Sequence, residues 1–296
     1  MTARTPTVFI VGAGPVATAL GGALRHAGVP VLGLFGRRAA AVRIAAGIAG
    51  IAGFSAAPPD LLLEADAIIV AVRDDAIAAV ARTLIDTGFV TRRHVLLHCS
   101  GGLSAAQAFG EVAPKVGGVG TLHPLRAIVD AKQAAQTLRG TTFGVEGDEQ
   151  GRAMAQTLVG WLGGVALDLQ GEGMALYHAA ASLASNYLVA LLDTAGAALA
   201  AAGVTGIAAL LPLVRGTLDN IERTGIPRAL TGPIARGDVG TVKRHLEALR
   251  GLAPEVLPVY QVLGRRAVAL ARAKGEAAAA DLDAIEAALV AAARVS

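Results

Sequence analysis

The chain has 296 residues, which is enough for two domains of ordinary size. Its net charge of +3 is spread along the chain and only 3% of its residues are aromatic, so the basic runs and stacking surfaces typical of nucleic-acid binding are absent from the sequence. A single cysteine, Cys99, excludes a disulfide framework and favours a cytoplasmic location.

Two apolar stretches raise the question of a membrane, because hydrophobic residues make up 54% of the chain. Residues 173–192 and 194–214 contain no charged side chain, and each stretch is long enough to cross a bilayer. Both are rich in alanine, and the first also carries His178, Ser182 and Asn186. We therefore expect buried helices of a soluble protein without a membrane partner. The apolar N-terminus is better explained by a strand and a glycine loop than by an export signal.

The first expected element is a β-strand at Val8–Val11, an apolar run that leads directly into glycines. Gly12, Gly14 and Ala17 form a G-x-G-x-x-A pattern, in which Gly12 permits a tight turn and Gly14 lets the backbone approach a pyrophosphate. Ala17 would keep the following helix close to the strand. Pro15 suits the first turn of that helix, because a missing N–H costs nothing there. The pattern predicts a dinucleotide site at the start of the helix.

A second strand is expected at Pro30–Phe35, at the spacing of a strand–helix–strand unit, and Arg37 and Arg38 follow it. An NAD site places an acidic residue about 20 residues after the glycines, where it binds the ribose hydroxyls. The first acidic residue of this chain is Asp60, well beyond that position. A guanidinium instead binds the 2′-phosphate of NADP, which a carboxylate would repel. The sequence therefore favours NADP over NAD.

Strands and helices continue to alternate up to residue 170, which predicts a parallel sheet with crossover helices. The remainder of the chain is expected to be helical and is rich in alanine and leucine. The expected fold class is α/β plus all-α: residues 1–170 form a dinucleotide-binding domain with a doubly wound, mostly parallel sheet, and residues 171–296 form a helical domain. Further strands are expected at Asp66–Val72, Val95–Cys99, Val116–Gly120, Phe143–Val145 and Val165–Leu169, and a helix near Gln150–Leu162.

Ligands of such sheets bind beyond the carboxyl ends of the strands, where His98, Ser100 and His123 are expected. Cys99 should point to the opposite face from its neighbour His98, so we expect no Cys–His pair. The histidines have no spacing typical of zinc ligands, and no metal site is predicted. The residues expected to hold the dinucleotide are Gly12, Gly14, Pro15, Val16, Ala17, Arg37, Arg38, Val72 and Ser100.

The first helix of the second domain is expected to carry His178, Ser182 and Asn186 at positions i, i+4 and i+8, on one face. Three polar groups on an apolar helix need hydrogen-bond partners. A substrate carbonyl or alcohol would be such a partner, and a polar contact between helices or between subunits is the alternative.

Four motifs of the chain resemble one protein family: His98-Cys-Ser-Gly101, Gly120-Thr-Leu-His-Pro-Leu-Arg126, Tyr177-His-Ala-Ala-Ala-Ser182 and Leu230-Thr-Gly-Pro-Ile-Ala-Arg-Gly-Asp238. Together with the glycine loop they are similar to Rossmann-like proteins whose helical C-terminal half is a domain of unknown function. That family is related to the 6-phosphogluconate dehydrogenase and ketopantoate reductase superfamily. The resemblance covers nearly the whole chain. It implies hydride transfer, a homodimer, and ketopantoate as a candidate substrate.

The resemblance has one departure, on the helix that carries the polar stripe. Well-studied relatives have a catalytic lysine there with an asparagine one or two turns later. Here His178 takes the position of the lysine, Ser182 takes the middle position, and Asn186 keeps the amide. In prephenate dehydrogenases a His-Pro pair comparable to His123-Pro124 lies at the active site, so His123 is a second candidate for the acid–base residue.

These observations predict an NADP-dependent oxidoreductase that acts on a small 2-oxo or 2-hydroxy acid. His178 or His123 would exchange the proton, since histidine has an ordinary pKa of about 6.5. The stripe's serine and asparagine would orient the carbonyl, and Arg126 or Arg236 would bind the substrate carboxylate. The alternatives are a prephenate- or pyrroline-carboxylate-type dehydrogenase and a non-catalytic NADP-sensing protein.

Overall fold

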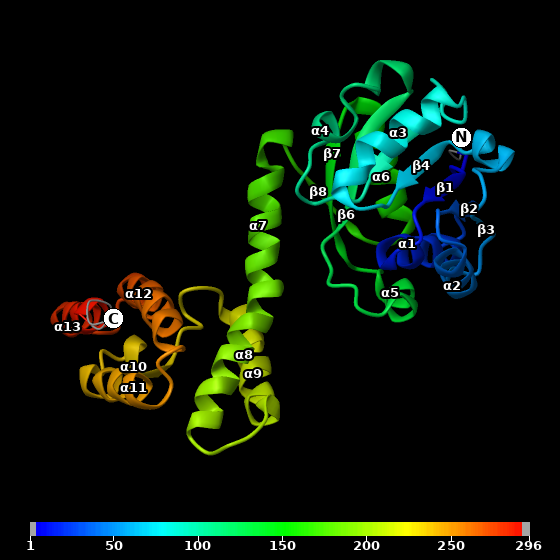
Figure 1. Ribbon diagram of the computed structural model, residues 1–296. Coiled ribbons are helices and arrows are strands. Elements are labelled where there is room, and N and C mark those ends of the chain that lie inside the picture. Colours follow the sequence, from blue (N-terminus) through cyan, green and yellow to red (C-terminus); the bar gives the residue numbers. More distant parts are fainter. Residues whose placement is uncertain (1–3, 292–296) are drawn as a thin grey trace. The chain divides into compact units, whose positions relative to one another are not determined.

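The computed structural model describes residues 4–291, which form two compact units that divide after Ser185 (Figure 1). The sequence predicts a boundary after residue 170. The difference lies in a helix, α7 (Met174–Ala184), which the structure assigns to the first unit. A side chain of this helix, Tyr177, hydrogen-bonds to His123 of the sheet, and this contact joins the helix to the first unit.

The first unit contains one eight-stranded sheet with the order β3-β2-β1-β4-β5-β6-β7-β8. All neighbouring strands are parallel except β6 and β7, which are antiparallel. The strand order reverses at β1, which lies between β2 and β4, and this is where sheets of this type bind ligands. The strands are β1 (Val8–Val11), β2 (Val31–Phe35), β3 (Gly53–Phe54), β4 (Ala67–Val70), β5 (Val95–His98), β6 (Gly118–Pro124), β7 (Thr142–Gly147) and β8 (Val165–Asp168).

Seven α-helices belong to this unit, and most of them connect successive strands, as the alternating pattern of the sequence predicts. They are α1 (Pro15–His26), α2 (Ala39–Ala49), α3 (Ile77–Asp86), α4 (Ala105–Phe109), α5 (Ala131–Thr137), α6 (Glu149–Trp161) and α7.

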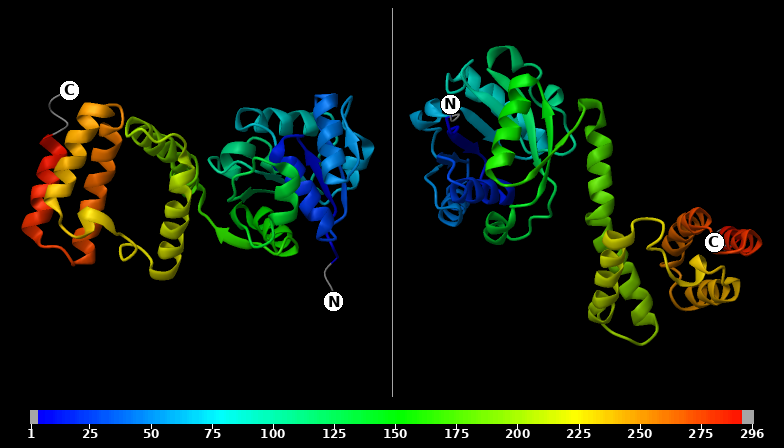
Figure 2. Two further views of the ribbon diagram at one scale, coloured as in Figure 1. Left: turned by 90° about the horizontal axis from the view of Figure 1, so that it is seen from below. Right: turned by 180° about the vertical axis from the view of Figure 1, so that it is seen from behind.

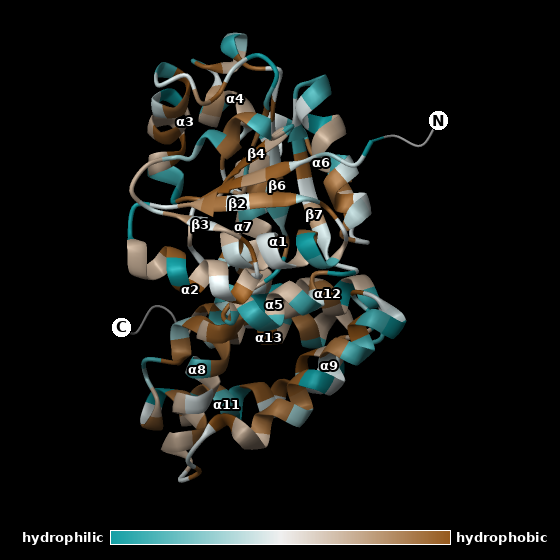
Figure 3. Cartoon of the chain, turned by 90° about the vertical axis from the view of Figure 1, so that its right-hand side faces the viewer, coloured by the Kyte–Doolittle hydropathy of each residue, from teal (hydrophilic) through white to brown (hydrophobic). Residues whose placement is uncertain are grey.

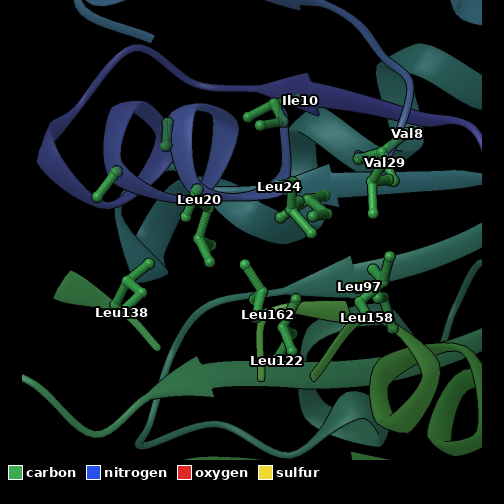
Figure 4. Packing of buried hydrophobic residues seen from close by; sticks show 14 of the residues in the cluster. Val8, Ile10, Leu20, Leu24, Val29, Leu97, Leu122, Leu138, Leu158 and Leu162 are labelled. Atoms are coloured by element: carbon green, nitrogen blue, oxygen red, sulfur yellow. The ribbon is translucent and has the colours of Figure 1, made fainter. Parts of the chain in front are cut away.

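Helices cover both faces of the sheet, so alternate residues of each central strand enter two separate cores. Val8 and Ile10 of β1 pack with α1, α2, α5 and α6 on one face (Figure 4). Phe9 and Val11 pack with α3 and α4 on the other face. Burial on both faces requires continuously apolar strands, and β4, with the sequence Ala-Ile-Ile-Val, is accordingly coloured brown in Figure 3. The expected doubly wound, mostly parallel sheet is confirmed.

The second unit is entirely helical in the part of it that the structure describes. Its core is formed by the last four helices, of which α11, α12 and α13 lie side by side (Figure 2). Its helices are α8 (Asn186–Ala201), α9 (Leu211–Thr224), α10 (Gly232–Ala235), α11 (Val239–Leu252), α12 (Leu257–Lys274) and α13 (Ala279–Ala291).

The expectation of buried helices over residues 173–214 is wrong for the single chain. Neither α8 nor α9 contains a buried residue, and Val189 and Leu213 are 70% and 68% exposed. The stretch Gly171–Ala201 is long and apolar enough to cross a membrane by length and composition alone. Its many alanines raise the mean hydropathy, but each alanine side chain has little apolar surface to bury. A high hydropathy therefore does not show that these helices are buried within one chain.

Candidate active site

The glycine loop between β1 and α1 has the conformation that its sequence predicts. Gly12 has a φ of +136°, and a Cβ there would lie 2.1 Å from the carbonyl oxygen of Ala71, so only glycine fits. Gly14 precedes the first residue of α1 and supplies no capping side chain. No described atom lies within 4 Å of the position that a Gly14 Cβ would take. The helix start therefore has open space in front of its free backbone N–H groups, which suits a phosphate.

The other loop residues pack α1 against the sheet as expected. Pro15 is the first residue of α1, Ala17 is fully buried, and Val16 is half-buried against the same core. Val72 follows β4, next to the Ala71 carbonyl that faces Gly12, and is half-buried.

Two arginines lie at the end of β2, beside the glycine loop. Gly36 approaches that loop closely, because a Cβ on Gly36 would lie 3.2 Å from the Cβ of Ala13. Arg37 and Arg38 follow directly and are exposed. Neither side chain makes an ion pair or a hydrogen bond with residues 4–291. Their guanidinium groups are thus available to an anion that binds near the loop.

The loop after β5 is held in shape by an acidic residue from the neighbouring strand end. The Ser100 hydroxyl donates to a carboxylate oxygen of Asp74 at 2.7 Å and accepts from the backbone N–H groups of Gly102 and Leu103 at 3.2 Å. Ser100 is only 6% exposed. Its hydroxyl therefore shapes the loop.

His98 is the last residue of β5, and its side chain is fully buried. Its Nδ1 accepts from the backbone N–H of Ser100 at 3.2 Å, so its Nε2 carries the proton and faces the Thr121 hydroxyl at 3.1 Å. The Thr121 hydroxyl in turn donates to a carboxylate oxygen of Glu146 at 3.3 Å. Burial lowers the pKa of His98 to about 4 and keeps its ring neutral. The expectation that His98 could reach a cofactor is therefore wrong.

Two other histidines meet over Gly101 in the same loop. A Cβ on Gly101 would lie 2.6 Å from Nδ1 of His178 and 2.8 Å from Nε2 of His123. The two imidazole rings are 5.8 Å apart between centroids and nearly perpendicular. His123 comes from β6 and His178 from α7, so three segments distant in sequence converge at one point. The absence of a side chain at position 101 is what admits both rings.

The environment of His123 sets its charge. Burial is the main cause that lowers its pKa to about 4, and repulsion by His178 adds to this effect, whereas the Asp74 carboxylate opposes it. His123 is therefore a neutral imidazole at neutral pH. Its Nδ1 lies 2.8 Å from the hydroxyl of Tyr177, a half-buried residue of α7. His178 is more exposed and makes no hydrogen bond with another described residue.

The expected polar stripe on one continuous helix is interrupted. α7 ends at Ala184, Ser185 is non-helical, and α8 begins at Asn186. Ser182 lies one turn after His178 on α7 and is half-buried, whereas Asn186 belongs to the second unit. The structure thus keeps two members of the stripe together within one unit.

The two candidate carboxylate-binding arginines also belong to different units. Arg126 follows β6 in the first unit, Arg236 follows α10 in the second, and both are exposed. Within the first unit, the glycine loop, Ser100, Gly101 and His123 all follow or end strands at the carboxyl edge of the sheet.

Sequence reasoning missed Tyr177, Asp74 and the role of Gly101. Tyr177 directly precedes His178 in the motif Tyr177-His-Ala-Ala-Ala-Ser182, but it does not share the i, i+4 and i+8 spacing of the polar stripe. Asp75, which lies just before α3, pairs with the exposed Arg73, and α3 has no side-chain cap.

Two further residues, a histidine and the cysteine, lie in or against the core. His94 is fully buried, and its Nδ1 accepts from the Thr91 backbone N–H at 2.9 Å. Cys99 packs half-buried against the core of one sheet face, and burial raises the pKa of its thiol to about 12.

One family model matches a segment that begins in the sheet and continues into the helical unit. Residues 141–267 match the model of a family described as a domain of unknown function, DUF2520. The matched segment includes β7, β8, the helix with Tyr177 and His178, and most of the second unit, but not the glycine loop or His123. No curated protein matches the chain.

Solved structures share the fold over nearly the whole length. TM1727 of Thermotoga maritima is 23% identical, with a TM-score of 0.72 over 90% of this chain and 99% of its own. BF3122 of Bacteroides fragilis, described as a candidate NADP oxidoreductase, is 21% identical, with a TM-score of 0.70 over 88% and 97%. A reductive aminase of Aspergillus terreus in complex with NADPH is 19% identical, with a TM-score of 0.56 over 98% and 94%. These likenesses show that the chain shares the Rossmann-type fold of these proteins, with a sheet followed by many helices.

Proposed function

We propose that the chain is an NADP-dependent oxidoreductase that transfers a hydride to or from a small 2-oxo or 2-hydroxy acid, with ketopantoate as the first candidate substrate. The observation that carries this proposal is the meeting of His123 and His178 over Gly101, at the same sheet edge as the glycine loop. A cofactor bound along that edge would bring its reactive ring toward two imidazoles.

The residues around the glycine loop fit a phosphorylated dinucleotide. Open space in front of Gly14 and the uncapped start of α1 would receive the pyrophosphate. Arg37 and Arg38, exposed and without an acidic partner among the described residues, would bind a 2′-phosphate. Two solved structures with a similar fold support NADP as the cofactor. BF3122 is described as a candidate NADP oxidoreductase, and the reductive aminase was solved in complex with NADPH.

When bound, the reduced nicotinamide would supply the hydride to the carbonyl carbon. His178 would give its proton to the carbonyl oxygen, because it is exposed enough to be reprotonated from solvent. His123 stays neutral and contributes a hydrogen bond rather than a proton. Ser182 and Asn186 would orient the carbonyl, and Arg126 or Arg236 would bind the carboxylate.

Turnover tests the proposal directly. NADPH oxidation is measured with a panel of 2-oxo acids, ketopantoate first. His178→Ala is expected to lower kcat by about 10²- to 10⁴-fold, since it removes the proton donor. His26→Ala, at an exposed histidine of α1, is the matched control and should leave kcat unchanged. If NADPH binds tightly but is oxidised with none of the acids, the result would instead support a non-catalytic NADP-sensing protein. Turnover with prephenate or pyrroline carboxylate only would support a dehydrogenase of the corresponding type.

We also propose that the chain is a cytoplasmic homodimer in which a second copy covers α8 and α9. Neither helix contains a buried residue in the single chain, although both expose large apolar side chains. Asp193 within α8 and the polar residues before it make a bilayer a poor partner for the same surface.

Light scattering without detergent should give twice the chain mass of 29.6 kDa. Val189→Glu with Leu213→Glu should give the single-chain mass, because charges would be buried between the copies. Ile44→Glu, on the 63% exposed Ile44 of α2, is the control and should remain dimeric. A monomeric wild-type chain, or one that requires detergent, would contradict the dimer.

A further inference from the structure

The Tyr177 phenol can contact His123 because a glycine on the neighbouring strand leaves room for it. Gly144 of β7 lies directly opposite His123 of β6 in the antiparallel register. A Cβ on Gly144 would lie 2.8 Å from the Tyr177 oxygen, so a side chain there would displace the phenol. The tyrosine and histidine rings meet edge to face, at 5.5 Å between centroids and 89° between planes. The contact therefore depends on three residues with complementary shapes.

The direction of the hydrogen bond follows from the groups around it. Burial is the main cause that raises the pKa of the Tyr177 phenol, so the phenol stays protonated, and the backbone of Gly144 acts in the opposite direction. The phenol proton is then free to be donated to Nδ1 of His123, 2.8 Å away. A neutral imidazole that accepts at Nδ1 carries its single proton on Nε2.

We propose that Tyr177 is a positioning residue that holds His123 in the tautomer with its proton on Nε2, so that this N–H points into the space beside Gly101. The Nε2 atom of His123 and the Nδ1 atom of His178 both border that space, since they lie 2.8 Å and 2.6 Å from the position that a Gly101 Cβ would take. The inference deepens the proposed function: a substrate carbonyl oxygen in this space accepts a hydrogen bond from His123 while His178 supplies a proton.

Atoms and electrons balance in this arrangement. The carbonyl carbon gains the hydride from NADPH, and the C=O double bond becomes a C–O single bond whose oxygen takes the proton of His178. NADPH is oxidised and the carbonyl is reduced. His123 keeps its proton throughout, and its N–H stabilises the negative charge that develops on the oxygen. Tyr177 keeps its proton as well, because its buried phenolate would be costly.

The test observes the tautomer independently of any reaction. In the full chain labelled with ¹⁵N-histidine at neutral pH, His123 should show a protonated Nε2 and an unprotonated Nδ1, with its signals assigned by their loss in His123→Gln. Tyr177→Phe should convert these signals to those of a tautomer mixture. It should also lower kcat about tenfold with the NADPH Kd unchanged, which is less than the roughly 10²- to 10³-fold cost of losing a whole oxyanion donor.

The chain offers a matched control in a second tyrosine–histidine pair. The Tyr260 hydroxyl lies 2.9 Å from Nδ1 of His245 in the second unit, with ring centroids 5.9 Å apart and an angle of 83° between the ring planes. Tyr260→Phe should change the signals of His245 and leave those of His123 and kcat untouched. Gly144→Ala is a second variant, which displaces the phenol without removing its hydroxyl and should reproduce the effect of Tyr177→Phe on His123.

Three outcomes would overturn the inference: a proton on Nδ1 of His123 in the wild type, an unchanged tautomer in both Tyr177→Phe and Gly144→Ala, or a kcat that is insensitive to a demonstrated tautomer change. If the tautomer shifts as expected but no acid oxidises NADPH in the wild type, the tautomer assignment stands and the proposed reaction is wrong. The two failures are therefore distinguishable.

Discussion

Gly101→Ala is expected to lower kcat by about 10²-fold while the Kd for NADPH and the thermal midpoint change little. The new Cβ would lie within 2.6 Å of His178 and 2.8 Å of His123, so both imidazoles must move away. Gly101 is not among the glycines with positive φ, and alanine can adopt its backbone conformation without strain. The effect should thus fall on the chemistry. Steady-state kinetics with the best 2-oxo acid, NADPH titration and thermal unfolding measure the three quantities.

Gly102→Ala provides the control one residue along the same loop. Its Cβ would lie 3.7 Å from the nearest His178 atom, an ordinary van der Waals contact. Its kcat should stay within a few-fold of the wild type. Equal losses in both variants would mean that the loop, and not the two imidazoles, limits the reaction. An active Gly101→Ala enzyme would remove the histidine pair from the mechanism.

Two variants are expected to weaken dinucleotide binding, one where the pyrophosphate would bind and one where the 2′-phosphate would bind. Gly14→Ala should weaken NADPH and NADH alike by at least about tenfold, because its Cβ enters the space proposed for the pyrophosphate. The same substitution meets no described atom within 4 Å in the free protein, so the thermal midpoint should not fall. Fluorescence titration of both nucleotides checks the prediction.

The double variant Arg37→Ser, Arg38→Ser should weaken NADPH by about 10- to 100-fold and leave NADH unchanged. Hydrogen bonds to charged groups contribute about 1.5–3 kcal/mol, and only NADPH carries the 2′-phosphate. Tighter binding of NADH than NADPH by the wild type, unaffected by the loss of both arginines, would overturn the preference for NADP. A normal NADPH affinity in Gly14→Ala would place the dinucleotide elsewhere.

The sheet was predictable because its signals are local. Apolar runs such as Val8–Val11 and the glycines after them report on strands and turns within a few residues, and Gly12 has the positive φ that this pattern needs. The break at Ser185 has no such signal, since neither proline nor glycine marks it in a sequence that favours helix on both sides. The compact units divide after Ser185, beyond the predicted boundary after residue 170, and the contact that joins α7 to the sheet is made to His123 on a distant strand.

The site was predictable only in part, because burial and contact depend on residues far apart in the sequence. His98 and His123 look alike as histidines at strand ends. Yet partners on neighbouring segments enclose the first, while the second faces the space beside Gly101. The Tyr177 contact requires an unsubstituted Gly144 on the opposite strand, which no spacing in the sequence indicates.

The division after Ser185 has an evolutionary consequence under the proposed function. Both imidazoles and the nucleotide loop belong to the sheet-bearing unit, whereas Asn186 and Arg236 belong to the helical one. Substitutions within the helical unit therefore leave every residue of the histidine pair and of the nucleotide loop in place. A lineage can thus vary its helical half while it inherits the histidine pair unchanged.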